Sequence, residues 1–291
     1  MVETVLVAGA TGTNGRALIE ALRQRSDIAI RALVRTDSKS DLGAGIETAV
    51  GDLADPASLA SAFQDIEKAY VVTAVQPDTV ALFQNFFDAA QAANVRHVVK
   101  FSGLGASHHS PSEIIRQHAA SDDALRASGL PFTILRPNSF HQNMLGQADE
   151  IARSGRFHLP LADARQSTID VRDLAEITAT ILTTEGHAGR TYDLTGPESL
   201  NFHDVARIIG DVRGDAVEYI PVTPEQMEAA LRKMGLPAWS AHALAEIQAL
   251  FATGAYSDPL PDAERLLGRA PTPFRQFAQD HVDAWRASPA A

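Results

Sequence analysis

The stretch Val7-Ala8-Gly9-Ala10-Thr11-Gly12-Thr13-Asn14-Gly15 decides the fold of this chain. Its three glycines stand three residues apart, between the apolar run Val5–Ala8 and a helical pattern over Asn14–Arg25. In such a turn the first glycine allows a tight bend, the second lets the backbone approach a pyrophosphate, and the third lets the helix pack close to the sheet. The free N–H groups of the helix N-terminus then face the phosphates. We therefore predict dinucleotide contacts from Gly9, Thr11, Gly12, Thr13, Asn14 and Gly15; a purely structural turn is the alternative.

Beyond this turn, short β-branched runs alternate with amphipathic segments as far as about residue 140. Strands that alternate with helices form a parallel sheet covered on both faces, so the sequence predicts an α/β, Rossmann-like doubly wound fold. The further strands are expected at Ala29–Val34, Glu47–Val50, Ala69–Thr73, His97–Phe101 and Phe132–Leu135. The further helices are expected at Asp55–Phe63, at Asp78–Ala93, and from the capping box Ser110-Pro111-Ser112-Glu113 to about Ser128.

The second half is less regular and reads as a smaller, mainly helical substrate lobe. The expected elements are helices at Asp173–Leu182, from the cap Asn201 to Ile209, from the cap Thr223 to about Met234 and at Ala241–Ala252, and a short strand at Thr191–Leu194. We expect a cofactor-binding domain of residues 1–150 plus about 188–198. The substrate lobe then comprises residues 151–187 and 199–291.

Composition narrows the functional class. The chain has 291 residues, 25 Lys and Arg against 36 Asp and Glu, a formal charge of −11 and no Cys. The lack of Cys excludes disulfides, Cys-ligated metals and thiol catalysis. The acidic balance argues against a nucleic-acid partner, and no apolar run is long enough for a membrane span. We expect a cytoplasmic protein, monomeric or homodimeric, with a small-molecule substrate. The pair His108-His109 lacks nearby carboxylates, so no metal site is expected.

The residues after the second and third strands bear on the nucleotide. Arg35 stands where an NAD site would carry Asp or Glu, and its guanidinium suits a 2′-phosphate, with Lys39 as a further donor. This favours NADP(H), although a solvated surface Arg35 is the competing interpretation. After the third strand, Asp52 is placed to accept from the adenine amino group while Leu53 covers the ring; alternatively, Asp52 is only a turn residue.

With these pieces, the chain resembles the NmrA-like, atypical short-chain dehydrogenase/reductases, above all their quinone-reductase and triphenylmethane-reductase branch. The resemblance covers nearly the whole chain. Its motifs are Gly9–Gly15, Ala32–Arg35, Gly51–Leu53, Val98–Ser102, Ser128–Asn138, Asp170–Ala175 and Tyr192–Pro197. It implies NADP(H) on the glycine turn, a substrate cleft between the lobes, and a nicotinamide half flanked by Thr73, Ala74, Val75, Phe101, Ser102, Gly103, Pro137 and Asn138.

The sequence departs from the superfamily in its catalytic helix. None of its four tyrosines has a Lys four residues on, so the usual Tyr-x-x-x-Lys acid is absent. Reductase relatives place a Lys or a His at the position of His118, whose ordinary pKa of about 6.5 suits proton donation near neutrality. The alternative is a helix-surface histidine bonded to Asp122 at i+4. Ser102, at the position of the superfamily's substrate-orienting Ser, is the second catalytic candidate, against a loop-capping role.

Several residues after Asn138 are expected to line the substrate cleft. They are Phe140, His141, Asn143 and Met144, with Trp239 in the second lobe forming an aromatic wall with Phe251 and Tyr256. For the three aromatic residues of the second lobe, ordinary core packing is an equally good interpretation.

Two functions follow from this pattern. The first is an NADPH-dependent reductase that transfers hydride to a conjugated acceptor such as a quinone, an enone or an iminium-like compound. In such acceptors the electron sink lies in the substrate, which fits the missing Tyr–Lys pair. The alternative is a non-catalytic NADP(H)-binding redox sensor of the NmrA type. A sugar-nucleotide epimerase shares the fold but needs the Tyr–Lys pair for its transient oxidation.

Overall fold

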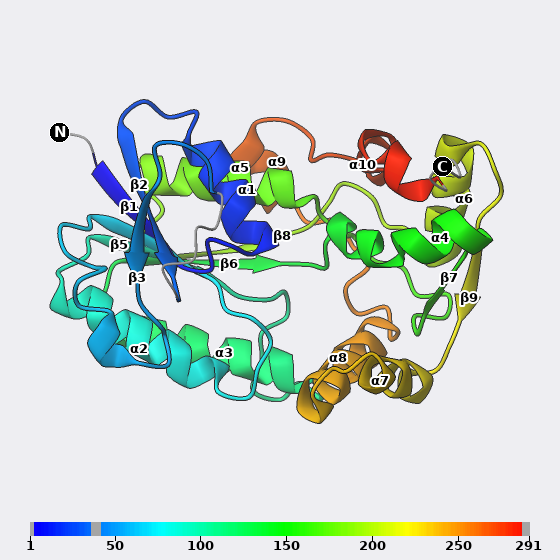
Figure 1. The fold of residues 1–291 in the computed structure, drawn as a ribbon, viewed down its shortest axis with the longest axis horizontal. Helices are drawn as coiled ribbons and strands as arrows, with labels where there is room; N and C mark the ends of the chain where they lie inside the picture. The colour runs from blue at the N-terminus through cyan, green and yellow to red at the C-terminus, as the bar shows by residue number, and fades with distance from the viewer. Residues whose placement is uncertain (1–2, 36–41, 287–291) are drawn as a thin grey trace. The chain divides into compact units, whose positions relative to one another are not determined.

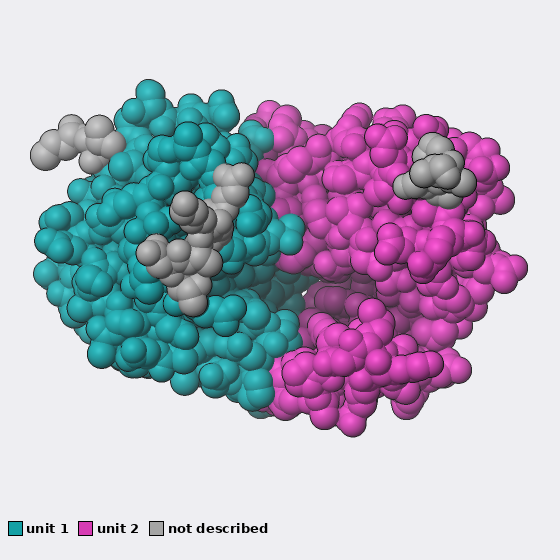
Figure 2. All heavy atoms as spheres, in the orientation of Figure 1, with its two compact units in different colours: residues 1–109, 115–137, 174–193 teal, residues 110–114, 138–173, 194–291 magenta. Residues whose placement is uncertain are grey.

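The computed structural model describes residues 3–35 and 42–286, which divide into two compact units. Unit 1 comprises Met1–His109, Ile115–Pro137 and Leu174–Asp193, and unit 2 comprises Ser110–Ile114, Asn138–Asp173 and Leu194–Ala291 (Figure 2). Each unit has a hydrophobic core of its own.

Unit 1 is built on a seven-stranded sheet with the order β3-β2-β1-β4-β5-β6-β8. The neighbouring pairs from β3 to β6 are all parallel, which confirms the predicted Rossmann-like fold. The order reverses between β1 and β4, and open sheets of this kind bind ligands at that reversal, beyond the carboxyl ends of the strands. The strands are β1 (Glu3–Val7), β2 (Ile28–Val34), β3 (Glu47–Val50), β4 (Lys68–Val71), β5 (His97–Phe101), β6 (Phe132–Pro137) and β8 (Arg190–Leu194).

Helices cover both faces of this sheet (Figure 1). α1 (Thr13–Leu22) and α5 (Val171–Thr183) lie on one side, and α2 (Thr79–Ala92) and α3 (Glu113–Ala127) lie on the other. On α2, three phenylalanines one to four residues apart are fully buried and form the centre of the core: Phe83, Phe86 and Phe87. Phe83, Phe87 and Ala90, which are spaced at helical intervals, all lie on the buried face of α2.

One expected helix of unit 1 is wrong. Only the 3-10 helix Pro56–Ser58 forms where a helix over Asp55–Phe63 was predicted. Asp55 does cap it, accepting from the N–H of Ala57 at 3.2 Å. The Ser58 hydroxyl, however, donates to the Asp55 carbonyl at 2.7 Å and so competes for an acceptor that an α-helix would need.

Unit 2 consists mainly of helices around a core of aromatic and aliphatic side chains. Two expected caps are confirmed: Asn201 accepts from Asp204 N–H, and Thr223 and Gln226 form a reciprocal capping box. The elements are η2 (His141–Gln147), α4 (Ala148–Ser154), β7 (Arg156–Leu159), α6 (Phe202–Arg213), β9 (Glu218–Pro221), α7 (Pro224–Lys233), α8 (Ala238–Phe251), α9 (Asp262–Leu267), α10 (Phe274–Asp280) and η3 (Val282–Trp285).

Several of these elements were not expected from the sequence. β7 and β9 form a separate two-stranded parallel sheet, and α9 and α10 occupy a tail that was described only as rich in proline. β7 and β9 carry too little alternation to be recognised, since only Phe157 of β7 and Tyr219 of β9 are buried.

The division between the units also differs from the expected bounds. Residues 138–150 fall in unit 2, and most of α5 falls in unit 1 rather than in the substrate lobe. The contacts of α5 explain its place. The Lys68 ammonium donates to the Leu182 carbonyl at 2.7 Å, and Ile177, Ile181 and Leu182 are completely buried.

The described residues include neither a membrane-spanning helix nor a cluster of metal-binding side chains. No helix in residues 3–35 and 42–286 has the length and hydropathy required to cross a membrane. The same residues contain no group of three or more His, Asp or Glu side chains arranged to hold a metal ion.

A buried histidine links the fold to pH. His97 Nε2 lies 2.9 Å from Thr133 Oγ1, whose hydroxyl donates to the His187 carbonyl at 2.7 Å. The imidazole is therefore the donor, and it is held neutral: burial lowers the pKa of His97 to about 4, and the charge of Lys68 acts in the same direction.

This predicts an acid-dependent loss of stability. Between pH 6.5 and 4 the unfolded chain binds a proton at His97 that the folded chain does not, so the free energy of unfolding falls with pH, by up to about 3 kcal/mol. In His97→Gln this part of the pH dependence should disappear in urea denaturation series at pH 7 and 4.5, whereas His109→Gln, at an exposed position, should behave like the wild type. Parallel pH dependences for wild type and His97→Gln would refute the assignment.

Candidate functional site

The predicted cofactor residues of unit 1 gather at one edge of the sheet. Because β1 to β6 are parallel, their carboxyl ends lie together, and the segments that follow them meet there. Gly9 follows β1, Arg35 follows β2, Asp52 follows β3, Thr73 follows β4 and Ser102 follows β5.

The glycine turn is shaped by close backbone contacts. Gly9 has φ +76°, and a Cβ there would lie 2.6 Å from Val72 Cγ1 and 2.8 Å from Val72 O. A Cβ on Gly15 would collide with the Gly9 carbonyl and lie 2.7 Å from Ala10 Cα. These two positions thus accept only glycine for internal reasons, a left-handed bend and a close helix approach.

Gly12 differs, because a Cβ there would meet only Gly9 O, at 3.4 Å. Gly12 is also the N-cap of α1, and no side chain caps this helix end. Nearby, Asn14 Oδ1 is buried without a hydrogen-bond partner among the described residues. An open side at Gly12 and an uncapped helix N-terminus are the features a phosphate cradle requires.

The residues expected around the adenosine half are placed as follows. Arg35 is exposed immediately after β2, and Lys39 lies outside the described residues. Asp52 Oδ1 accepts from Ala54 N–H at 3.0 Å, which is the turn role that was weighed as its alternative. Leu53 packs against the core of unit 1, and its carbonyl accepts from Asn85 at 2.8 Å.

The loop after β4 is held by a residue that sequence reasoning missed. Gln117 of α3 donates from Nε2 to the carbonyls of Gln76 and Pro77, at 3.2 and 3.1 Å. These bonds anchor the segment that carries Thr73, Ala74 and Val75, and Val75 is 39% exposed despite being apolar. No sequence pattern points to Gln117, since its partners are backbone atoms 40 and 41 residues away.

Three charged residues of unit 1, Lys100, Asp122 and Arg136, form a buried ion cluster. Lys100 Nζ donates to Asp122 Oδ1 at 2.7 Å, and Arg136 donates twice to Oδ2, at 3.0 and 2.8 Å. Lys100 and Asp122 are completely buried, and Lys100 also lies 4.5 Å over the Phe83 ring. Lys100 is thus half of a buried ion pair whose carboxylate lies 22 residues further along the chain.

The cluster controls the charge of its members. Burial lowers the pKa of Lys100 to about 8 against the opposing effect of Asp122. Burial tends to raise the pKa of Asp122, but Lys100 and the hydrogen bonds outweigh it, so that the pKa is lowered. The Ser102 hydroxyl contributes to this lowering, yet its buried Oγ reaches no described residue in normal hydrogen-bond geometry.

His118 is placed beside this cluster, in α3, with its ring against Gly103. A Cβ on Gly103 would lie 2.7 Å from His118 Cδ2 and 3.2 Å from Nε2, so the glycine makes room for the imidazole. Its Nδ1 is buried, without a hydrogen-bond partner among the described residues. The expected pairing with Asp122 at i+4 is wrong, because Lys100 and Arg136 occupy both carboxylate oxygens.

The surroundings of His118 in the structure oppose the proton donation near neutrality that the sequence predicts. Burial lowers the pKa of His118 to about 3, and the positive charge of Lys100 acts in the same direction. The imidazole is therefore neutral at pH 7, and it offers a hydrogen bond rather than an acidic proton.

Pro137 ends β6, and its carbonyl accepts from Leu104 N–H at 2.9 Å. Asn138 begins a segment of unit 2 and is 3% exposed. Its amide nitrogen donates to Ser167 Oγ and to the Tyr256 carbonyl, at 3.1 and 2.9 Å. The side chain of Asn138 thus has a full structural role within unit 2.

Four of the five expected substrate residues surround one small pocket inside unit 2. Phe140, His141, Asn143 and Met144 line it, and Trp239 does not. His141 is fully engaged: Nδ1 lies 2.9 Å from Thr168 Oγ1, Nε2 lies 3.1 Å from the Thr272 carbonyl, and burial lowers its pKa. Met144 belongs to the core of unit 2.

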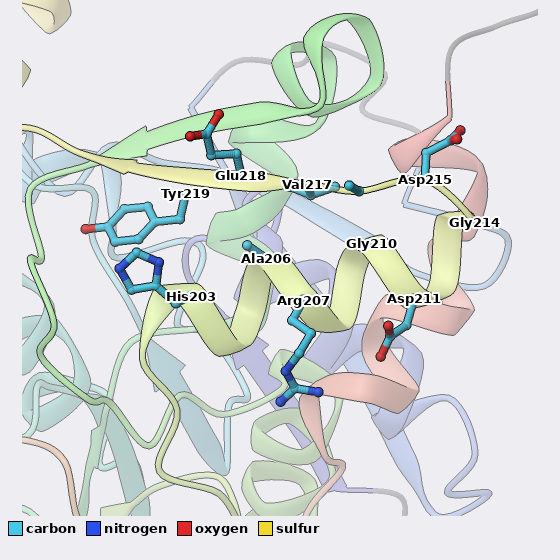
Figure 3. Close-up of a pocket in the computed structure, with 11 residues that line it drawn as sticks. His203, Ala206, Arg207, Gly210, Asp211, Gly214, Asp215, Val217, Glu218 and Tyr219 are labelled. Carbon is cyan, nitrogen blue, oxygen red and sulfur yellow. The ribbon is translucent and has the colours of Figure 1, made fainter.

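A wider groove of about 720 Å³ lies along α6 and β9 of the same unit (Figure 3). Its charged groups do not converge, since Glu218 and Arg207 point to opposite sides (Figure 3). Several also have local partners, such as Arg156 for Glu218 and Arg275 for Asp211. We therefore do not regard this groove as a catalytic site.

Comparison with known proteins identifies the family. The model of an NAD(P)H-binding family matches residues 9–185. The NAD(P)H azoreductase of Xenophilus azovorans is 35% identical over 286 residues, which cover 98% of this chain and all of the relative.

Two solved structures support the same conclusion. The NADPH-dependent quinone oxidoreductase of Escherichia coli, complexed with NADPH, has a TM-score of 0.85 and 28% identity over 95% of this chain and 99% of that one. The triphenylmethane reductase of Citrobacter sp. has a TM-score of 0.85 and 27% identity over 96% and 99%. The resemblance drawn from the motifs is confirmed.

The ion cluster generates a stability prediction. In Asp122→Asn, Lys100 is left buried without a carboxylate, so the free energy of unfolding should fall by roughly 3–5 kcal/mol in urea denaturation. The matched control is Asp123→Asn, which removes the neighbouring, 58% exposed carboxylate paired with His108 and Arg126. That change should cost less than about 1 kcal/mol. Equal losses in the two variants would contradict a buried cluster.

Proposed function

The chain belongs to the NAD(P)H-binding family, and we propose that it is an NADPH-dependent reductase of conjugated acceptors such as quinones, enones or iminium-like compounds. The observation that carries the proposal is the turn Gly9–Gly15, whose open side at Gly12 adjoins an uncapped helix N-terminus at the edge where six parallel strands end. The azo, quinone and triphenylmethane acceptors named for the relatives are all extended conjugated systems.

For the nucleotide we propose NADPH rather than NADH. Gly9, Thr11, Gly12, Thr13, Asn14 and Gly15 hold the pyrophosphate, Arg35 and Lys39 hold the 2′-phosphate, and Asp52 and Leu53 meet the adenine. Thr73, Ala74, Val75, Phe101, Ser102, Pro137 and Asn138 adjoin the nicotinamide half. The quinone oxidoreductase of E. coli is NADPH-dependent, and its structure contains NADPH, which supports this choice.

The tyrosines support chemistry without a strong protein acid. Tyr70 is 2% exposed, and burial raises its pKa far above the ordinary value. Tyr192 is hydrogen bonded to His187, and Tyr219 to the Leu159 carbonyl. A conjugated acceptor suits this arrangement, because its own π-system takes up the electron pair.

We assign two residues to the reaction. When bound, NADPH supplies a hydride from C4 of its nicotinamide. A quinone that accepts it becomes a hydroquinone anion, and a proton from water completes the product. The neutral imidazole of His118 and the hydroxyl of Ser102 donate hydrogen bonds to the oxygen on which negative charge develops. His118 thus acts as a hydrogen-bond donor, not as an imidazolium acid.

A substitution at Arg35 tests whether the chain prefers NADPH to NADH. Arg35→Ala should raise the KM for NADPH by roughly tenfold or more and the KM for NADH by less than about twofold, since only NADPH carries the 2′-phosphate. Absorbance at 340 nm with a quinone and enone panel measures both. Arg25→Ala, which removes an exposed arginine before β2 rather than after it, is the control. Equal effects on the two nucleotides would overturn the assignment, and NADPH binding without turnover of any acceptor would favour the redox sensor.

A substitution at Gly103, which lies against the ring of His118, tests the role of His118 in the reaction. Gly103→Ala should displace the imidazole and lower kcat by about tenfold, with little change in the KM for NADPH. The ring signals of His118 in ¹H–¹⁵N NMR report the displacement directly. Gly146→Ala is the control, because a Cβ there meets no atom within 4 Å. Displaced ring signals with an unchanged kcat would remove His118 from the mechanism.

A further inference from the structure

The small pocket of unit 2 has a lining that is apolar except at a few points. It contains about 40 Å³ of space, which is enough for one oxygen-bearing end of a ring compound and too little for a whole substrate. The lining residues are Ser139, Phe140, His141, Asn143, Met144, Leu159, Leu161, Gln166, Thr168, Leu200, Phe202, Val205, Gln248 and Phe274.

Most polar side chains of this lining already have partners. His141 pairs with Thr168, and Asn143 donates to Ser139 Oγ at 3.0 Å. Gln166 and Gln248 are different, since neither carboxamide makes a hydrogen bond to another described residue, and both Gln166 Nε2 and Gln248 Oε1 are buried. Gln166 as a whole is only 2% exposed.

Such groups are costly to bury unless something pairs with them. An unpaired buried amide destabilises a protein by roughly 1–3 kcal/mol. Each carboxamide offers both a donor and an acceptor, so this conclusion does not depend on which way either amide is turned. Two unpaired amides beside the same small space therefore indicate a ligand that both accepts and donates hydrogen bonds.

The remaining lining limits the chemistry of that ligand. It contains no Asp, Glu, Lys or Arg, and the lowered pKa keeps His141 neutral. A charged ligand would lose its hydration without compensation, so the ligand is uncharged. The rings of Phe140, Phe202 and Phe274 and the thioether of Met144 favour an aromatic or quinonoid group.

We propose that this pocket binds the oxygen-bearing end of an uncharged quinone or hydroquinone, with Gln166 and Gln248 as its hydrogen-bonding residues. The choice of a quinone as the ligand rests on the proposed reductase function. A quinone carbonyl accepts from an amide N–H, and the hydroxyl of the hydroquinone product also donates to an amide oxygen. The pocket thereby selects acceptors that carry an oxygen at the ring edge.

Binding is tested with hydroquinone, a phenol that is uncharged at pH 7, and with 1,4-difluorobenzene as a ring of similar shape without O–H groups. The methionines of the described residues are Met144, Met227 and Met234, and among these only Met144 lines the pocket. In ¹³C-methyl-methionine NMR, hydroquinone should shift the Met144 signal, identified by its loss in Met144→Leu, and leave Met227 and Met234 of the α7 region unmoved. The difluoro compound should bind at least about tenfold more weakly.

Substitution tests the two amides. Gln166→Leu and Gln248→Leu should each raise the Kd for hydroquinone by about tenfold, whereas Gln279→Leu, at an exposed position of α10, should not change it. If a leucine variant fails to fold, the comparison of the two ligands on the wild type decides. No shift at Met144, an equal affinity for the two ligands, or an unchanged Kd in both folded variants overturns the proposal.

The outcome is separable from that of the reductase activity. Quinone turnover with an unmoved Met144 signal refutes the pocket and leaves the reductase function standing. A Met144 shift with amide-dependent affinity but no turnover of any acceptor supports the pocket as a binding site and refutes the reductase.

Discussion

The hydrogen-bonded cluster of Lys100, Asp122 and Arg136 is the interaction on which the candidate site of unit 1 depends. It joins β5, α3 and β6 through a single carboxylate that has no access to water. Ser102 follows directly on the strand that carries Lys100, and His118 lies one helical turn before Asp122, so the cluster fixes both candidate catalytic residues. Replacing such a cluster with apolar residues often leaves stability unchanged or improves it, so its value here lies in where it holds those residues.

The same cluster decides what His118 can do. A solvated histidine beside a carboxylate would be partly protonated at neutral pH, which is what the sequence suggests for His118 and Asp122. In the structure, Asp122 is fully occupied by two cations, and the charge of Lys100 adds to the effect of burial. The imidazole consequently serves as a neutral hydrogen-bond donor. This role requires an acceptor that stabilises its own negative charge, and conjugated compounds meet that requirement.

The features that could be predicted from the sequence are those set by neighbours along the chain. The turn Gly9–Gly15, the six strands before residue 140 and the caps Asn201 and Thr223 depend on local backbone geometry or periodicity, and the structure contains each of them. The partners of Asp122 lie 22 and 14 residues away, and those of Gln117 about 40, so no local pattern indicates them. For the same reason the two unpaired amides of Gln166 and Gln248, 82 positions apart, could not be found before the fold was known.

The two candidate sites also differ in which atoms form them. The glycine turn presents backbone N–H groups. A side chain at Gly9 or Gly15 would collide with neighbouring atoms, and Gly12 leaves the space beside the turn open. The pocket of unit 2 presents side chains only, with two amides set among aromatic and aliphatic groups. A backbone site tolerates most substitutions around it, whereas one substitution at Gln166 or Gln248 changes the hydrogen bonds that the pocket offers.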